Sequence, residues 1–129
     1  MNVRNKPILC VDFDGVIHLY TTPWERADII SDGPVPGALR WLWKATEWFD
    51  VHIYSIRSKS SAGIKAMHEW MVKHSAEEWD DLHPMCTTLL EAYPITFSHE
   101  KPAAFLTIDD RALCFGDRAG RFKPWNKRG

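Results

Sequence analysis

The sequence predicts an α/β fold of three layers, α/β/α, with a mainly parallel sheet. Apolar, β-branched segments of strand length alternate along the chain with longer segments whose apolar residues recur at helical spacing. A helix between two successive strands favours a parallel crossover connection. In such sheets ligands bind beyond the carboxyl ends of the strands, so the residues that directly follow each strand are the candidates for function.

The composition favours one soluble domain. A chain of 129 residues is long enough for a single hydrophobic core, and we treat residues 1–129 as one domain. The formal net charge of -1 gives no overall attraction to nucleic acid or to an anionic membrane. The three cysteines show no C-x-x-C spacing, and the first residues do not resemble a signal peptide. We therefore expect a reduced, cytoplasmic setting.

The first expected strand covers residues 8–11, where four consecutive apolar residues are typical of a strand buried on both faces. It changes abruptly into Asp12-Phe13-Asp14-Gly15, so two carboxylates leave the sheet at a strand end. Gly15 permits the backbone angles of a tight turn just beyond them. Taken alone, an ordinary polar turn explains this segment as well as a functional site does.

The rest of the chain continues the alternation. The segment after Gly15 is rich in glycine, proline and threonine, which favours a loop that lies over the end of the first strand. The next segment is apolar around most of its circumference, as in a mostly buried helix. In chain order we expect a loop at 16–37, a helix at 38–49, a strand at 51–56, a helix at 62–73 capped by Ser60 or Ser61, a short helix at 85–93, and strands at 95–98 and 103–108.

Three further expectations concern the surface and the core. The acidic run at 77–81 should be a solvated turn. Residues 117–129 are basic with two interleaved aromatic residues, so we expect a surface tail. Nucleic acid is a candidate partner for such a tail. Most of the seven tryptophans fall at helical spacing, which core packing explains better than a binding platform.

Polar residues suited to phosphate or metal chemistry follow later elements as well. Ser55 comes at the end of the second strand, Lys101 after the third, and Asp109-Asp110 after the fourth. Because the carboxyl ends of parallel strands meet at one edge of a sheet, we expect these side chains near the first pair of aspartates. Each also has a structural explanation. Ser55 could satisfy the backbone, Lys101 could be a surface lysine, and Asp110 could pair with Arg111.

The order of these residues resembles the four motifs of the haloacid dehalogenase superfamily of phosphohydrolases. The matching residues are Asp12-Phe13-Asp14-Gly15, Ser55, Lys101 and Asp109-Asp110, and the resemblance spans residues 8–111. It implies a Rossmann-like sheet and the hydrolysis of phosphate esters. The spacing between the motifs leaves no room for a separate cap domain, so the chain looks like a small capless member.

The resemblance also implies a role for each residue. Asp12 would attack phosphorus and form an aspartyl-phosphate. Asp14 would protonate the leaving oxygen and later deprotonate the hydrolytic water, which requires that it hold a proton near neutral pH. Ser55 would donate a hydrogen bond to a phosphoryl oxygen, and Lys101 would offset the charge of the phosphate and the carboxylates.

The cofactor that the resemblance implies is Mg²⁺, a hard cation that prefers oxygen ligands. It would lie between the Asp12 carboxylate, the Asp14 backbone carbonyl and Asp109, while Asp110 would bind it through water or orient its ligands. The charges support a cation independently of the resemblance. Four converging carboxylates repel one another increasingly as solvent is excluded, so a bound cation is needed to keep most of them ionised.

Two nearby residues keep alternative roles. Arg57 lies two residues after Ser55, so it could bind the phosphate of the substrate or form an ion pair. His18 follows the Asp-x-Asp-Gly turn closely, so it could touch substrate or pack within the loop. His68 and His74 lie on a helix remote from the strand ends and lack zinc-ligand spacing, so we assign them no metal role.

The sequence thus predicts a Mg²⁺-dependent phosphatase whose substrate is a phosphorylated small molecule or the phosphorylated terminus of a macromolecule. Two alternatives use the same fold. One is a nucleic-acid-processing enzyme that acts on a terminal phosphate, and the other is a non-catalytic module that binds phosphate or nucleic acid. We expect no membrane partner, because no segment approaches membrane-spanning length.

Overall fold

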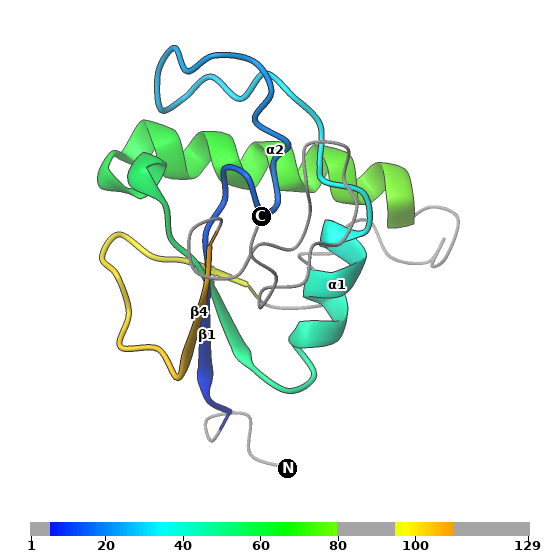
Figure 1. The fold of residues 1–129 in the computed structure, drawn as a ribbon, viewed down its shortest axis with the longest axis vertical. Helices are drawn as coiled ribbons and strands as arrows, with labels where there is room; N and C mark the ends of the chain where they lie inside the picture. The colour runs from blue at the N-terminus through cyan, green and yellow to red at the C-terminus, as the bar shows by residue number, and fades with distance from the viewer. Residues whose placement is uncertain (1–5, 80–94, 110–129) are drawn as a thin grey trace, which may run out of the picture.

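The protein forms a parallel β-sheet with helices packed against it (Figure 1). The computed structural model describes residues 6–79 and 95–109. In chain order the described elements are β1 (Ile8–Val11), α1 (Ala38–Ala45), β2 (Asp50–Ile53), the short 3-10 helix η2 (Ile56–Lys59), α2 (Ser61–Trp79), β3 (Thr96–Phe97) and β4 (Leu106–Ile108).

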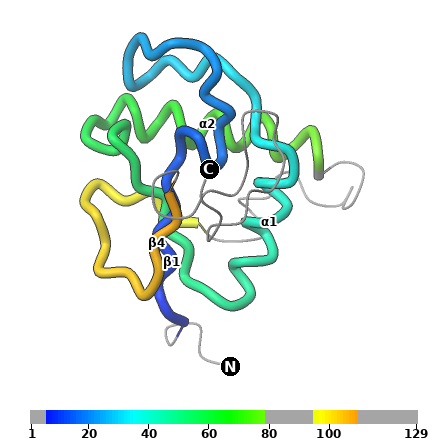
Figure 2. Tube along the Cα trace, viewed as in Figure 1, coloured from blue at the N-terminus to red at the C-terminus, as the bar shows by residue number. Residues whose placement is uncertain are grey.

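The four strands follow the order β3-β2-β1-β4, and every neighbouring pair is parallel. β1 is therefore central, with β2 on one side and β4 on the other. The trace in Figure 2 shows β1 and β4 side by side, although most of the chain separates them in sequence. The carboxyl ends of these three strands lie at the same edge of the sheet. The predicted α/β class with a parallel sheet is confirmed.

The hydrophobic core lies on one face of the sheet. Leu9 and Val11 of β1 pair in register with Val51 and Ile53 of β2, so these four side chains point to the same face. The helices contribute buried residues to the same cluster, namely Leu39, Leu42 and Ala45 of α1 and Met67, Trp70 and Met71 of α2. The strands β1, β2 and β3 follow one another in the same direction across the sheet, and each parallel connection between them contains one α-helix among the described residues. Because such crossovers are right-handed, both helices lie on the same face of the sheet. A third layer stays a prediction.

Several predicted elements have different ends in the structure. α1 stops at Ala45, and the next residues continue as turns whose N–H groups bond back to Lys44 and Ala45. Trp48 in this segment is 70% exposed, so it is not a core residue. α2 is longer than predicted and ends at Trp79.

The prediction of a solvated turn is therefore wrong for Glu77 and Glu78, which lie in the last turn of α2. A local contact supports this turn, because the Glu77 carboxylate accepts a hydrogen bond from His74 Nδ1 across one helical turn at 3.0 Å. The Ser60 hydroxyl caps the start of the same helix by accepting a hydrogen bond from the Gly63 N–H, as predicted.

Some predictions concern residues outside the described ranges. They are the remaining acidic residues Asp80 and Asp81, the short helix at 85–93, the metal role of Asp110, and the basic tail at 117–129. Within the described ranges, no helix is long and apolar enough to cross a membrane.

Candidate active site

A pocket of about 180 Å³ lies at the carboxyl ends of the central strands, on the opposite face from the core. The alternation of side chains along a strand explains this position. Cys10 and Thr107 are register partners in β1 and β4, and Asp12 and Asp109 follow each of them by two residues, so all four side chains point the same way. Tyr54, which follows β2, completes this wall.

Four residues predicted for the active site line this one pocket, although they come from four separate parts of the chain: Asp12, Ser55, Lys101 and Asp109. β1 and β4 are joined at the site, because the Asp12 N–H donates to the Ile108 carbonyl at 2.9 Å. The Asp12 carboxylate in turn accepts a hydrogen bond from the Phe13 N–H at 2.8 Å, which fixes its orientation at the strand end. Gly15 makes the following turn possible with a φ of 84°.

Ser55 serves the backbone and also reaches the pocket. It is the N-cap of η2, where its Oγ accepts a hydrogen bond from the Arg57 N–H at 2.9 Å. The Ser58 hydroxyl reciprocates by accepting a bond from the Ser55 N–H at 3.0 Å. The Ser55 side chain is 4% exposed and is therefore held rigidly at the pocket wall. The structural role weighed for Ser55 is therefore present. Its hydroxyl donates to Met67 Sδ at 3.7 Å, so it must turn from this contact to donate to a ligand in the pocket.

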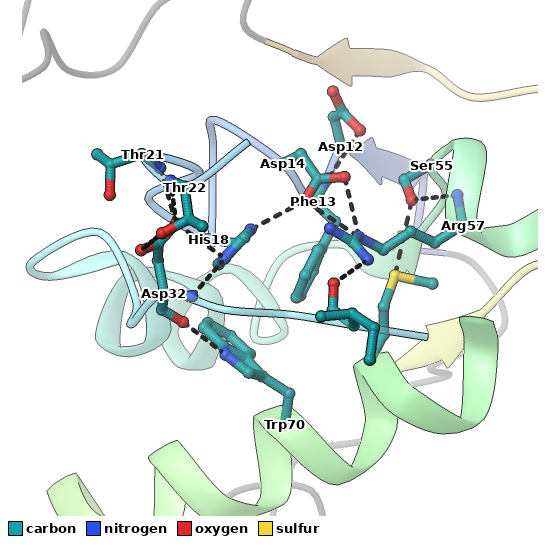
Figure 3. Close-up of polar contacts among 12 residues, drawn as sticks. Asp12, Phe13, Asp14, His18, Thr21, Thr22, Asp32, Ser55, Arg57 and Trp70 are labelled. Carbon is teal, nitrogen blue, oxygen red and sulfur yellow. Dashed lines mark hydrogen bonds and ion pairs between the residues drawn. The ribbon is translucent and has the colours of Figure 1, made fainter. Parts of the chain in front are cut away.

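The Asp14 side chain does not line the pocket. It points toward Arg57 and His18 (Figure 3). Its carboxylate accepts hydrogen bonds from Arg57 Nε at 3.0 and 3.1 Å and contacts His18 Nδ1 at 2.9 Å. Burial alone raises the pKa of Asp14, but the hydrogen bonds from His18 and Arg57 and the charge of Arg57 outweigh it, so the net pKa lies below its ordinary value. Asp14 is thus ionised in this arrangement and does not hold the proton that the predicted acid/base role requires.

His18 is packed within the loop, which is one of the two roles considered for it. It is 1% exposed, and its ring stacks on Phe13 with centroids 5.6 Å apart. The Asp32 N–H donates to His18 Nε2 at 3.1 Å, so Nε2 is an acceptor. The ring proton is therefore on Nδ1, which donates to the Asp14 carboxylate.

Arg57 forms the ion pair that was the alternative to substrate binding. The side chain is 1% exposed and does not line the pocket. Its Nε donates to both oxygens of Asp14, and its Nη1 donates to the backbone carbonyls of Arg26, Ala27 and Ile29 at 3.2, 2.8 and 2.9 Å. One guanidinium group therefore connects the first motif to the loop at 16–37.

The same loop has a hydrogen bond to α2 and a set of internal hydrogen bonds that the sequence did not reveal. Trp70 of α2 donates from Nε1 to the Asp32 carbonyl at 2.9 Å. The Asp32 carboxylate accepts bonds from the N–H groups of Thr21 and Thr22 and from the Thr22 hydroxyl. These bonds lower the pKa of Asp32 to about 2. In sequence, Asp32-Gly33-Pro34 reads only as a turn, so its bonding partners were not predictable.

Cys10, Tyr54 and Thr107 line the pocket but were not among the predicted site residues. The strand period offered a signal for two of them, because Cys10 and Thr107 lie two residues before the predicted Asp12 and Asp109. Cys10 is a buried free cysteine. Burial raises the pKa of its thiol; the charge of Lys101 opposes this shift, and the carboxylates of Asp12 and Asp109 add to it.

Two carboxylates, Asp12 and Asp109, share the pocket with Lys101. Their oxygens are ligands that suit a hard cation. Within residues 6–79 and 95–109, however, no three His, Cys, Asp or Glu side chains are grouped as metal ligands. The expected fourth carboxylate, Asp110, is outside these ranges.

Comparisons with protein-family models, with curated proteins and with solved structures gave no match to this chain. The resemblance to the haloacid dehalogenase superfamily therefore depends on the motif residues themselves.

Proposed function

We propose that the chain is a Mg²⁺-dependent phosphomonoester hydrolase of the haloacid dehalogenase type, without a cap domain. The observation that carries the proposal is the convergence of Asp12, Ser55, Lys101 and Asp109 on one pocket. A carboxylate nucleophile, a hydroxyl donor, a cation and a second carboxylate are the groups that phosphoryl transfer through an aspartyl-phosphate needs.

In the proposed reaction an Asp12 carboxylate oxygen forms a bond to phosphorus while the bond from phosphorus to the ester oxygen breaks. The bond from Phe13 N–H holds the carboxylate in one orientation, which reduces the entropy lost on reaching the transition state. Water then attacks the aspartyl-phosphate, releases inorganic phosphate and restores the Asp12 carboxylate. Lys101 and the Ser55 hydroxyl offset the charge on the phosphoryl oxygens during both steps.

Mg²⁺ would be held by the carboxylates of Asp12 and Asp109, with Asp110 and the Asp14 backbone carbonyl as further expected ligands. When bound, it neutralises charge on the phosphoryl group and allows the two carboxylates to approach the same anion. The oxygen-rich composition of the pocket wall supports this assignment.

The leaving oxygen of an alkyl ester needs a proton, and Asp14 is the expected donor. To serve in this role, its side chain must turn from Arg57 and His18 toward the pocket, because the contacts seen here keep it ionised. An aryl phosphate such as p-nitrophenyl phosphate has a leaving group that is stable as an anion. Its hydrolysis therefore tests Asp12 without depending on the proton from Asp14.

Asp12→Asn tests the proposal directly. Wild-type protein should hydrolyse p-nitrophenyl phosphate only with Mg²⁺, and Asp12→Asn should reduce the rate to background, because an amide oxygen is a poor nucleophile at phosphorus. Asp28→Asn is the matched control, since Asp28 is an exposed loop aspartate that pairs with the exposed Arg26. It should retain activity. Wild-type inactivity across a broad panel of phosphomonoesters with Mg²⁺ would contradict the proposal.

The finer features of the fold belong to the same proposal. A Rossmann-like arrangement with three layers agrees with the parallel order β3-β2-β1-β4 and with a site at the carboxyl ends of β1 and β4. A reduced, cytoplasmic setting suits the buried free thiol of Cys10.

A further inference from the structure

Trp24 is an exposed aromatic residue with one face fixed against a cation. The Cζ atom of Arg57 lies over the indole ring, 4.6 Å from its centroid. The side chain nevertheless remains 42% exposed. This arrangement differs from core packing, the role expected for most tryptophans in this chain. It leaves part of the indole accessible to solvent.

The support beneath Trp24 is rigid. The Arg57 guanidinium is held by the Asp14 carboxylate and by three backbone carbonyls of the loop that carries Trp24. Because Arg57 is 1% exposed, it has little freedom to move away from the ring. A ligand that stacks on Trp24 therefore needs little further ordering of the protein, which favours binding.

Trp24 is linked to the phosphoryl pocket through the short helix η2. Ser55 and Ile56 line that pocket, and the next residue, Arg57, lies under the Trp24 ring. Ile56 is 63% exposed, so an apolar side chain stands at the pocket wall one residue before Arg57. The short helix η2 thus connects the pocket to the aromatic surface.

The pocket volume indicates where the rest of a substrate must lie. At about 180 Å³ it is smaller than the roughly 300–1,000 Å³ of sites that enclose a whole drug-sized ligand. A phosphoryl group fits such a space, and the group esterified to it must extend outside. Trp24 and Ile56 offer the extending part an aromatic face and an aliphatic side chain.

We propose that Trp24 binds a nucleobase of the substrate by stacking, so that the site acts on the phosphate of a nucleotide, either free or at the end of an oligonucleotide. This inference depends on the proposed phosphatase function and adds the substrate class to it. Stacking suits an indole ring, since every base has a π-face, and it tolerates different bases. Arg57 under the ring is a positioning residue for Trp24.

The test compares a nucleoside monophosphate with ribose phosphate, which has the same phosphate and sugar but no base. Wild-type kcat/KM should be higher for the nucleotide. Trp24→Leu should lower kcat/KM for the nucleotide by roughly tenfold or more, the effect expected of losing one stacked base, and should leave ribose phosphate nearly unchanged. Trp24→Phe keeps a ring and should restore most of the preference.

Trp48→Leu is the matched control. Trp48 is 70% exposed and precedes β2, at the end of that strand opposite to the pocket. Its replacement should change neither substrate. An equal loss for both substrates in Trp24→Leu would show that Trp24 only supports the loop, and an unchanged preference would show that it does not contact the base. Either result overturns the inference.

A binding measurement separates this inference from the proposed function. Asp12→Asn should bind a nucleoside monophosphate without turnover, and its affinity, measured by calorimetry, should fall when Trp24→Leu is added. Wild-type inactivity on every phosphomonoester would reject the phosphatase proposal, whereas activity without any effect of Trp24 would reject only the stacking site. A terminally phosphorylated oligonucleotide with a higher kcat/KM than the free nucleotide would identify the oligonucleotide as the source.

Discussion

Arg57 is a long charged side chain that folding has withdrawn from both solvent and pocket. A buried charge is costly unless it is paired and hydrogen-bonded. Here the guanidinium donates hydrogen bonds to one carboxylate and to three backbone carbonyls, which matches its planar set of donors. The same pairing explains why Asp14 is ionised, and it makes the position of Asp14 dependent on the loop at 16–37.

Asp32 gives a prediction for pH dependence at the residue scale. Its pKa is lowered from 3.8 to about 2, first through the backbone hydrogen bond from Thr22 and then through the other threonine donors, so the folded protein binds fewer protons here than the unfolded chain does. The resulting stability is present above about pH 4 and is lost as the pH falls from 4 toward 2. Among the described residues, the ionisable side chain next to the Asp32 carboxylate is His18, whose Nε2 atom lies 3.8 Å from it.

Asp32→Asn should therefore flatten the pH dependence of the free energy of unfolding between pH 4 and pH 2, as measured by urea denaturation at several pH values. Thr22→Val removes the hydroxyl donor but keeps the backbone donors, so it should flatten the curve by less. A wild-type slope in Asp32→Asn would show that these hydrogen bonds do not persist in solution.

At the scale of elements, the contact between η2 and the first turn of α2 sets the position of Ser55 and Arg57. Gly63 makes that contact possible. A Cβ atom on this residue would overlap the backbone carbonyl group of Arg57, and the Ser60 hydroxyl is also close. The absence of a side chain at this one helical position lets the two elements approach, which holds the pocket wall and the Arg57 side chain in place.

Gly63→Ala should destabilise the protein by about 1–3 kcal/mol, because the steric conflict with a backbone group outweighs the gain in helix propensity. Gly33→Ala is the matched control, since a Cβ there meets nothing within 4 Å, and it should change stability by less than about 0.5 kcal/mol. Urea denaturation measures both. Equal stability of the two variants would mean that η2 can shift without cost.

At the scale of the whole molecule, one hydrophobic cluster joins the described elements. It contains residues of β1, β2 and β4 together with both helices, and Phe13 and Ile17 extend it to the loop after the first motif. The polar network of Asp14, His18 and Arg57 lies directly over Phe13. The sheet, the helices and the site-bearing loop are therefore expected to unfold together rather than in separate steps.

This expectation is testable with two probes. Unfolding followed by tryptophan fluorescence and by far-UV circular dichroism should give coincident midpoints. Met71→Ala, at a fully buried position of α2, should lower both midpoints together and cost about 2–5 kcal/mol. Lys65→Ala on the exposed face of the same helix should leave them nearly unchanged. Separate midpoints in the wild type would show that the loop folds independently of the core.

Much of this architecture was predictable from local patterns. The apolar run at 8–11, the helical spacing after Gly37 and the turn at Gly15 each depend on neighbouring residues, and all three agree with the structure. The ends of elements were less predictable. α2 continues to Trp79, and a side-chain contact between His74 and Glu77 in its last turns is one that the apolar spacing does not report.

The sequence by itself determined the strands, the helices and the polar residues that follow each strand, because these follow from the period of side chains along a regular backbone. It therefore indicated Asp12, Asp14, Ser55, Lys101, Asp109 and Asp110 as a group. Of these, Asp12, Ser55, Lys101 and Asp109 line one pocket, the Asp14 side chain does not, and Asp110 lies outside the described residues. Only the tertiary structure decided where the long side chains go. Arg57 and Asp14 were each able to face a phosphate, and carbonyl groups from a distant loop hold Arg57, and Asp14 with it, outside the pocket lining. The reason is physical: a buried guanidinium must satisfy its donors wherever folding places acceptors, and the acceptors here are separated from it by about 30 residues of chain.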